Sequence, residues 1–171
     1  ANLSQKFEAE LEEGFDPYAH YLHFRKINAA PFGGYMNFGD MQIASTSPES
    51  FLSVKDRHVV TRPIKGTMPR SIDTQTDLIN RDKLEKSTKD RAENIMIVDL
   101  LRNDLSKACK PDSVHVDHLC EIKSFAGVHH LVSAVSGTLE HDKDAIDVFQ
   151  ACFPGGSITG APKIRAMEII Q

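Results

Sequence analysis

The sequence predicts an α+β fold in which helices pack against antiparallel β-strands, and three observations support this class. Two pairs of short strand-like segments are each joined by a tight turn, within residues 34–45 and 51–61. Residues 113–122 and 128–137 have the character of longer strands. A helix from about 89 to 107 is apolar nearly all round in its middle, so we expect it to be buried.

The remaining elements follow from local signals along the chain. Asp16-Pro17 begins a helix, because aspartate is a favoured N-cap and proline a favoured first helical residue. Gly39-Asp40 and residues 55–57 form the turns of the two hairpins, and we expect the four strands to share one antiparallel sheet. Residues 73–88 are polar and predict a loop with an exposed helix, and residues 145–153 predict another helix.

Composition excludes several classes of function. The chain has 171 residues, enough for one domain with a sizeable core. Lys and Arg number 20 against 24 Asp and Glu, and the net charge of -4 argues against a nucleic-acid partner. No apolar run approaches the roughly 20 residues of a membrane span, and no secretory signal is recognisable. Three scattered cysteines without a C-x-x-C pair predict reduced thiols in a cytoplasmic protein.

The first candidate site is the segment Arg-Pro-Ile-Lys-Gly-Thr-Met-Pro-Arg at residues 62–70. Its two prolines stiffen the backbone, and Gly66 can approach a ligand without a side chain in the way. Lys65 is thus a single amine beside free N–H groups and the hydroxyl of Thr67, which suits a nucleophile or a carboxylate clamp. The alternative is a basic surface turn between a strand and a helix.

Two carboxylates are candidate acid–base groups or metal ligands. Glu93 lies on the helix expected to be buried and has no cation at i+3 or i+4, so an acid–base role or a metal ion would explain it. Glu49 follows a proline and has hydroxyl residues on both sides; its alternative is an exposed turn carboxylate. Asp99 stands three residues before Arg102, which predicts a local structural ion pair.

Four histidines lie on the two long predicted strands. Adjacent residues of a strand face opposite sides, so only one of His129 and His130 can line a given pocket. By the same alternation we expect His115 and His118 to split across the two faces. This expectation argues against a metal site built on that pair.

A glycine-rich loop, Phe-Pro-Gly-Gly-Ser-Ile-Thr-Gly-Ala-Pro-Lys at residues 153–163, leads into a helix. Such a helix start directs N–H groups and the positive end of the helix dipole at an anion. Ala161 rather than lysine follows Gly160, which excludes a nucleotide-phosphate loop and favours a carboxylate. The alternative is a tight structural turn.

Together these motifs are more specific than any one of them, and in their order they resemble the chorismate-binding enzymes. They lie at residues 2–7, 47–49, 62–70, 90–94, 99–104, 129–133 and 154–163. The resemblance runs nearly from end to end and implies a layered sandwich of two antiparallel sheets with outer helices. Lys65 favours the branch of the family that aminates chorismate at C4, because the anthranilate-forming branch typically has alanine there.

The resemblance implies that ammonia replaces the 4-hydroxyl group of chorismate, with Mg²⁺ as cofactor and a glutamine amidotransferase partner supplying the ammonia. The product serves p-aminobenzoate and folate synthesis. By analogy Lys65 adds to ring C2 as a neutral amine, Glu49 is the acid–base group near the leaving oxygen, and Glu93 is a magnesium ligand. The substrate-binding residues implied are Gly66, Thr67, His130, Ser157, Thr159 and Gly160.

We expect residues 1–171 to be a partial catalytic domain of this family. The chain opens without an initiator methionine and closes within a helical pattern. Family members have an N-terminal half before the shared motifs. After them they continue with an arginine-bearing strand, a glycine-rich carboxylate loop and a further magnesium-binding glutamate. We therefore expect the 171 residues to be inactive alone.

Three alternatives stay open. An anthranilate-forming relative would give an ortho amine with loss of pyruvate. An isochorismate-forming relative would add water at C2, and Lys65 argues against it. A catalytically inactive binding or scaffold domain is the third alternative, because so much of the family's site lies outside these motifs.

Overall fold

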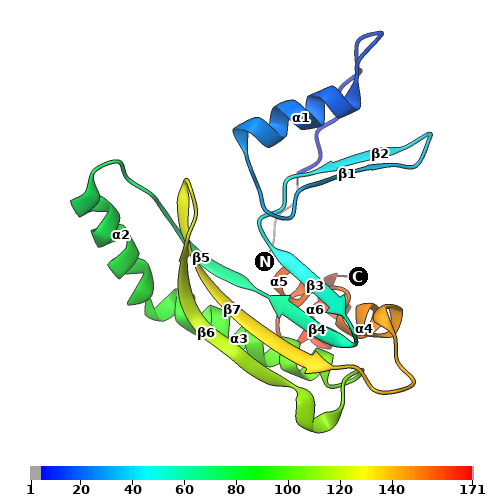
Figure 1. Cartoon of the computed structure of the whole chain (residues 1–171), viewed down its shortest axis with the longest axis vertical. Helices are drawn as coiled ribbons and strands as arrows, with labels where there is room; N and C mark the ends of the chain where they lie inside the picture. Colours follow the sequence, from blue (N-terminus) through cyan, green and yellow to red (C-terminus); the bar gives the residue numbers. More distant parts are fainter. Residues whose placement is uncertain (1–4, 171) are drawn as a thin grey trace. The chain divides into compact units, whose positions relative to one another are not determined.

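The structure is a computed structural model that describes residues 5–170. Residues 2–4 of the first family motif, and the last residue of the chain, lie outside the described residues. Within 5–170 the chain forms two compact units, residues 5–50 and residues 51–170 (Figure 1).

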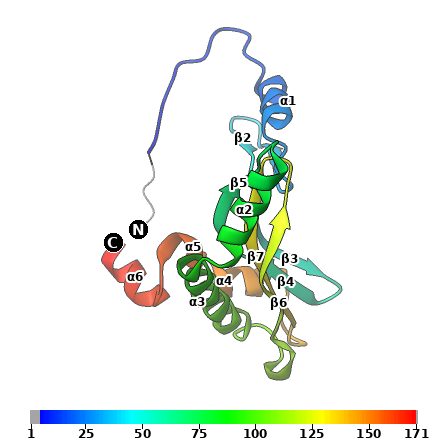
Figure 2. The same ribbon diagram turned by 90° about the vertical axis from the view of Figure 1, so that its left-hand side faces the viewer.

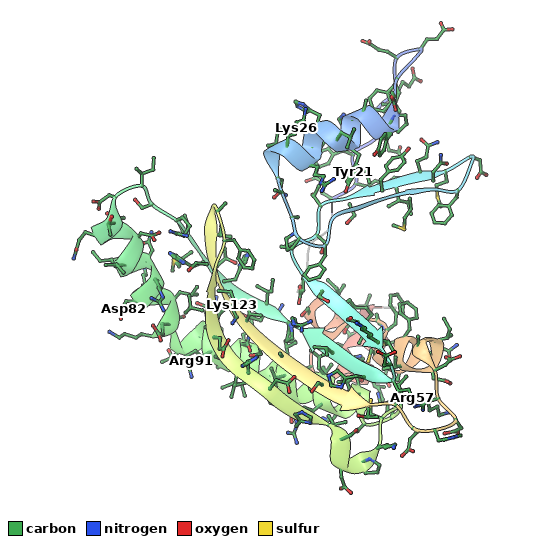
Figure 3. All side chains as sticks on the ribbon, in the orientation of Figure 1. Tyr21, Lys26, Arg57, Asp82, Arg91 and Lys123 are labelled. Atoms are coloured by element: carbon green, nitrogen blue, oxygen red, sulfur yellow. The ribbon has the colours of Figure 1, made fainter. Side chains whose placement is uncertain are left out.

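The smaller unit combines a helix with a β-hairpin, as predicted. α1 (Pro17–Ile27) is capped by Asp16, whose Oδ1 accepts hydrogen bonds from two backbone N–H groups of the first turn at 2.9 and 3.2 Å. β1 (Gly34–Asn37) and β2 (Gln42–Ser45) form an antiparallel pair. Tyr21 points from α1 towards the hairpin, and its ring centroid is 5.7 Å from that of a tyrosine in β1 (Figure 3).

The larger unit is built on a five-stranded antiparallel sheet. Its strands are β3 (Ser50–Lys55), β4 (His58–Arg62), β5 (Ile64–Pro69), β6 (His115–Ser124) and β7 (Val128–Thr138). β6 pairs with one edge of β7, so β4 and β5 share the other edge. β4 and β5 follow each other along this edge and are separated only by Pro63. The carbonyl oxygen of Pro63 still accepts a hydrogen bond from the N–H of Ser133 in β7, at 3.1 Å. The hairpin β1–β2 is a separate sheet, so the prediction that all four short strands share one sheet is wrong.

Helices cover one face of the five-stranded sheet (Figure 2). They are α2 (Thr74–Glu85), α3 (Thr88–Leu105) and α4 (Ala145–Cys152). α5 (Gly156–Thr159) contacts α3, α6 (Lys163–Ile170) contacts α5, and a short 3-10 helix, η1 (Pro111–Ser113), precedes β6. Val98 and Leu105 of α3 and Val148 of α4 pack against Val59 and Val135 of the sheet. Each such side chain contributes about 1.5–3 kcal/mol on full burial, so this apolar layer holds the helices on the sheet.

The α+β class is confirmed, with antiparallel strands throughout the described pairs. Face-to-face packing of two sheets is not present within the described part of either unit. Among the helices of residues 5–170, none combines the length and the apolar character that crossing a bilayer requires.

α3 is buried on one side only, which corrects the expectation that it is buried all round. The buried side comprises Asn94, Ile97, Val98, Leu101, Asp104 and Leu105. Ile95 and Met96 are 45% and 43% exposed. The sheet covers one side of the helix, and Ile95 and Met96 lie outside that side; Met96 lines a pocket with residues 161–164. The local ion pair is confirmed: Arg102 NH1 lies 3.4 Å from Asp99 Oδ1, and both side chains are exposed.

β6 contains two irregularities that change which side chains share a face. His115 pairs with Ser136 and His118 pairs with Ala134, which lie on the same face of β7. The prediction that these two histidines split across the sheet is therefore wrong, because register shifts break the alternation of two. Each histidine contacts its own carboxylate: His115 Nε2 is 3.1 Å from an oxygen of Asp117, and His118 Nδ1 is 3.0 Å from one of Glu121.

Asp77 ties α2 to the end of β5 and to β7. Its Oδ1 accepts from Arg70 Nε at 2.8 Å and from the N–H of Ser71 at 2.9 Å, and lies 3.0 Å from His129 Nε2. His129 is 2% exposed, and its Nδ1 is 2.8 Å from the hydroxyl of Ser124. The Arg70 guanidinium and the Ser71 N–H together lower the pKa of Asp77 to about 2.

We expect Asp77→Asn to lower the free energy of unfolding at pH 7 and to flatten its decline in acid. The folded-state pKa of about 2 lies below the ordinary value of 3.8, so the ionised carboxylate stabilises the fold fully above pH 3.8. This stabilisation is lost as the pH falls through about 2. Denaturant unfolding followed by circular dichroism across this pH range measures it. Asp82→Asn, which removes an exposed partner of Lys86, is the control. Identical acid profiles for wild type and Asp77→Asn would contradict the role given to Asp77.

Candidate functional site

A bulge in β5 presents Lys65 and Thr67 to opposite faces of the sheet. Lys65 pairs with Leu131, Thr67 pairs with His130, and Gly66 is the additional residue between them. Leu131 and His130 are neighbours in β7 and face opposite ways. Leu131 is fully buried in a cluster with Leu84 of α2, so Lys65 faces the helices and Thr67 faces the other side. Regular alternation would have placed Lys65 and Thr67 on one face.

Gly66 allows this bulge for two physical reasons. Its φ of +78° lies in the left-handed region, which side chains disfavour. A Cβ at this position would lie 2.8 Å from Leu84 Cδ1 and 2.9 Å from Asp90 Cβ. The backbone of β5 therefore touches the first turn of α3, and Lys65 lies beside that turn.

Lys65 carries an amine without a protein partner. The side chain is half-buried, and it makes no hydrogen bond or ion pair with another residue in the described range. An ion pair would favour the charged form of the amine and so oppose nucleophilic attack. No such ion pair is present for Lys65 among residues 5–170.

Glu93 lies on the exposed side of α3, one turn after Asp90, the residue that touches Gly66 of β5. Its carboxylate makes no hydrogen bond or ion pair with the residues that the structure describes. The premise that Glu93 lies on a buried helix is wrong, because its side of α3 is exposed. Because Asp90 of the same helix touches Gly66, Glu93 and Lys65 lie in the same region of the larger unit.

Thr67 and His130 form a pair on the face opposite to Lys65. Thr67 Oγ1 is 2.9 Å from His130 Nδ1, and the ring of Phe125 meets His130 edge-on with centroids 5.5 Å apart. β5 lies at the edge of the sheet and has one strand neighbour, β7, among the described strands. A small ligand at that edge can contact groups from both faces.

Glu49 belongs to the smaller unit, directly before β3. It is half-buried, and its N–H donates to Ser47 Oγ at 3.3 Å, while that hydroxyl donates to the Glu49 carbonyl oxygen at 3.2 Å. This local turn orders the backbone that carries the carboxylate. Lys65 belongs to the larger unit, so the two predicted catalytic residues come from different units.

The glycine-rich loop contains a helical turn, α5, that the sequence did not predict. Gly156 opens α5 and packs so closely on α3 that a Cβ there would lie 2.6 Å from Leu100 Cδ2. Gly160 ends the turn with a φ of +121°, which favours glycine. The predicted substrate-binding residues of this loop, Ser157, Thr159 and Gly160, therefore lie within and just after one short turn beside α3.

A buried ion pair that the sequence analysis missed anchors this loop. Asp104 of α3 has a side chain only 4% exposed, and its carboxylate contacts Lys163 Nζ and lies 2.8 Å from Lys107 Nζ. Lys163 Nζ also donates to the carbonyl oxygen of Cys152 at 2.9 Å. These bonds hold the start of α6 against α3 and the end of α4. The sequence offers one signal for this ion pair, because Asp104 is a polar residue on the side of α3 that packs against the fold. Its partner Lys163 lies 59 residues away, so no local pattern identifies it.

Glu93 is the residue to which the sequence analysis assigned a divalent cation. No group of three or more His, Cys, Asp or Glu side chains within residues 5–170 could hold a metal ion. Mg²⁺ is commonly bound through one or two carboxylates together with water and substrate oxygens. An exposed carboxylate without a protein partner, such as that of Glu93, fits this role as a single ligand.

Comparison with known proteins matches the whole chain to one protein family. Residues 1–171 match a family described as chorismate binding enzyme. Aminodeoxychorismate synthase component 1 of Salmonella typhimurium is 48% identical over 170 residues, which cover 99% of this chain and 37% of that relative. Anthranilate synthase component 1 of Saccharomyces cerevisiae is 44% identical over 155 residues, which cover 90% of this chain and 31% of that relative.

A solved structure has the same arrangement of elements. The crystal structure of anthranilate synthase component I from Streptococcus pneumoniae matches with a TM-score of 0.78 and 37% sequence identity. The match covers 91% of this chain and 34% of that chain. This chain therefore spans about a third of the length of the proteins it resembles.

Proposed function

The chain belongs to the family of chorismate-binding enzymes, and on this premise we propose that it takes part in the amination of chorismate at C4, which gives 4-amino-4-deoxychorismate. The observation that carries the proposal is the amine of Lys65, half-buried on an edge strand and without a partner in the described chain. A similar protein at 48% identity is named aminodeoxychorismate synthase component 1. The product would serve p-aminobenzoate and folate synthesis.

Lys65 acts as the nucleophile in this proposal. Its neutral amine forms a bond to ring C2, both conjugated ring double bonds shift towards C4, and the C4–O bond breaks. Glu49 donates the proton with which the hydroxyl group leaves as water. Ammonia then adds at C4 and gives a proton back to Glu49. Both ring double bonds shift in the opposite sense, and the C2–N bond breaks to restore the amine of Lys65.

Glu93 would hold Mg²⁺ as one of its ligands. When bound, Mg²⁺ neutralises a carboxylate of the dianionic substrate and so eases the loss of a poor leaving group. The exposed position of Glu93 and its lack of a protein partner support this role.

The remaining predicted residues would bind and orient the substrate. The backbone N–H of Gly66 and the hydroxyl groups of Thr67 and Ser157 would donate hydrogen bonds to a carboxylate. The Thr159 hydroxyl and the Gly160 N–H donate within the loop to the carbonyl oxygens of Gly155 and Gly156, at 3.2 and 2.9 Å, and would exchange these bonds for the substrate. His130 would lie against the ring, oriented by Thr67 at 2.9 Å. The edge position of β5 supports a substrate that meets groups from both faces of the sheet.

We also propose that a glutamine amidotransferase supplies the ammonia and that residues 1–171 are a portion of the catalytic domain. The name component 1 of the similar proteins implies a second component. The chain spans 37% of the length of that relative, which supports the view that further ligands for the substrate and the metal come from other residues.

Anthranilate synthesis is the second candidate, because relatives with that name are 44% identical in sequence or have a TM-score of 0.78. The two reactions give different products. The amination proposed here retains the enolpyruvyl group at C3 and puts the amine at C4, whereas anthranilate carries an ortho amine and has lost pyruvate. Lys65 favours the first reaction because only that one, by the resemblance, uses a lysine at this position.

The experiment incubates the full gene product with chorismate, Mg²⁺ and ammonium, and identifies the product by mass spectrometry and chromatography. We expect 4-amino-4-deoxychorismate from the full gene product and no turnover from the isolated 171 residues. Anthranilate as the product would favour the second candidate, and no product with intact chorismate binding would favour a non-catalytic domain. Turnover by the isolated 171 residues would contradict the proposal that they hold part of the site.

A further inference from the structure

Asn94 is a fully buried polar side chain in the N-terminal half of α3. Its Nδ2 donates to the carbonyl oxygen of Leu131 at 3.2 Å. Its Oδ1 accepts a hydrogen bond from Ser133 Oγ and lies 3.6 Å from Cys120 Sγ. No buried side-chain nitrogen or oxygen among the described residues lacks a partner. A buried amide left unpaired is costly, so these contacts hold α3 in one position along β7.

The same network includes a bulge of β6. Cys120 has a φ of +54°, and its N–H donates to Ser133 Oγ at 2.8 Å instead of pairing in the register of β6 and β7. Its Sγ lies 3.9 Å from the carbonyl oxygen of Arg91 in α3. Three elements therefore meet at Asn94, and a shift of α3 along the sheet would break bonds to both strands.

The network also locates α3 relative to β5. The carbonyl group that Asn94 holds belongs to Leu131, the residue paired with Lys65. One turn earlier, Asp90 touches Gly66, the residue after Lys65. α3 is thus fixed against the sheet by one polar contact and one steric contact, and Glu93 lies between them in the sequence.

From these contacts we propose that Asn94 is a positioning residue that sets the separation between the carboxylate of Glu93 and the amine of Lys65. The inference rests on the proposed function, in which both groups act on one substrate. Asn94 is 0% exposed, so it acts through Glu93 rather than by touching the substrate. A side chain that only fills the core would affect stability alone, whereas a positioning residue also affects metal affinity and turnover.

The test compares Asn94→Ala and Ser133→Ala in the full gene product, with Mn²⁺ as a paramagnetic probe of the Mg²⁺ site. We expect Asn94→Ala to weaken Mn²⁺ binding by about 10–100-fold, as for residues that support metal ligands. We expect kcat for amination to fall by about 100-fold, with a smaller change in KM for chorismate. Ser133→Ala should change both quantities in the same direction by a smaller factor, because it removes one of the bonds to Asn94.

Asn103→Ala is the matched control, because Asn103 is an exposed residue of the same helix whose Nδ2 donates to the Asp99 carbonyl oxygen at 3.1 Å. Thermal unfolding of each variant is measured alongside, and Ser133→Ala decides the matter if Asn94→Ala does not fold. The inference is overturned, and the proposed function kept, if the wild type is active and both variants, Asn94→Ala and Ser133→Ala, retain its Mn²⁺ affinity and kcat while only their melting temperatures fall. A wild type that neither binds Mn²⁺ nor aminates chorismate would overturn the proposed function, and the inference with it.

Discussion

Lys65→Ala in the full gene product is expected to lower kcat for the amination of chorismate by more than about 10³-fold, because it removes the proposed nucleophile. Lys65→Arg should be equally inactive, since a guanidinium keeps the charge and the length but is not deprotonated and cannot add to the ring. An electrostatic clamp would tolerate arginine, and a nucleophile would not. Rates measured with saturating ammonium and Mg²⁺ make the comparison independent of any ammonia-supplying partner.

Mass spectrometry without ammonia tests the same residue by its covalent chemistry. In wild type we expect an adduct with the mass of chorismate less water on the peptide that contains Lys65. Both variants at position 65 should lack the adduct. Lys55→Ala, which changes an exposed lysine at the end of β3, should retain both adduct and activity. An active Lys65→Arg enzyme, or an adduct that persists without Lys65, would contradict the mechanism.

Gly66→Ala is expected to destabilise the larger unit by about 2–5 kcal/mol. A side chain in the left-handed region, where Gly66 has a φ of +78°, costs about 1–2 kcal/mol. The added Cβ would lie 2.8 Å from Leu84 Cδ1 and 2.9 Å from Asp90 Cβ, and overpacking of this kind costs about 1–3 kcal/mol. Chemical unfolding followed by circular dichroism measures the sum.

Two further substitutions separate the causes. Gly127→Ala adds a Cβ with nothing within 4 Å and without a positive φ, so we expect a change within about 0.5 kcal/mol. Gly66→Asn relieves part of the backbone strain, because asparagine tolerates the left-handed region better, but it keeps the steric contact. A Gly66→Ala protein as stable as Gly127→Ala would show that β5 does not approach α2 and α3 as closely as the structure has it.

Elements determined by neighbouring residues could be predicted from the sequence. Asp16-Pro17 begins α1 because the cap and the first helical residue act on each other directly. Asp56 and Arg57, with φ values of +50° and +67°, make the tight turn between β3 and β4 at the predicted place. The division of His129 and His130 between the two faces also follows from local geometry: one is buried against α2 and the other contacts Thr67.

Positions of side chains across the sheet could not be predicted in the same way. The alternation of two fails wherever one strand contains an extra residue, as at Gly66 in β5 and near Cys120 in β6. Whether a bulge forms depends on the elements packed against the strand, and the pattern of polar and apolar residues within the strand does not reveal which elements those are. For this reason the sequence suggested that Lys65 and Thr67 act side by side, whereas the structure gives them opposite faces.

Contacts between residues distant in sequence are the second reason why the structure differs from the prediction. Asn94 was part of a family motif, but its bonds to Leu131 and Ser133 connect residues far apart in the chain. The apolar run over residues 95–101 correctly indicated that α3 packs against the fold, but not that Ile95 and Met96 would lie off the side that the sheet covers. Hydrophobicity alone does not distinguish a face buried in this chain from one left open.

The interruptions of β5 also have a consequence for how molecules of this protein meet one another. An edge strand offers unpaired backbone groups to which a strand of another molecule can add. Pro63 and Pro69 have no N–H to donate, and the bulge at Gly66 disturbs the even spacing that such an added strand would need. The strand that carries Lys65 is therefore poorly suited to intermolecular β-sheet growth, and the residues that interrupt it also protect it from aggregation.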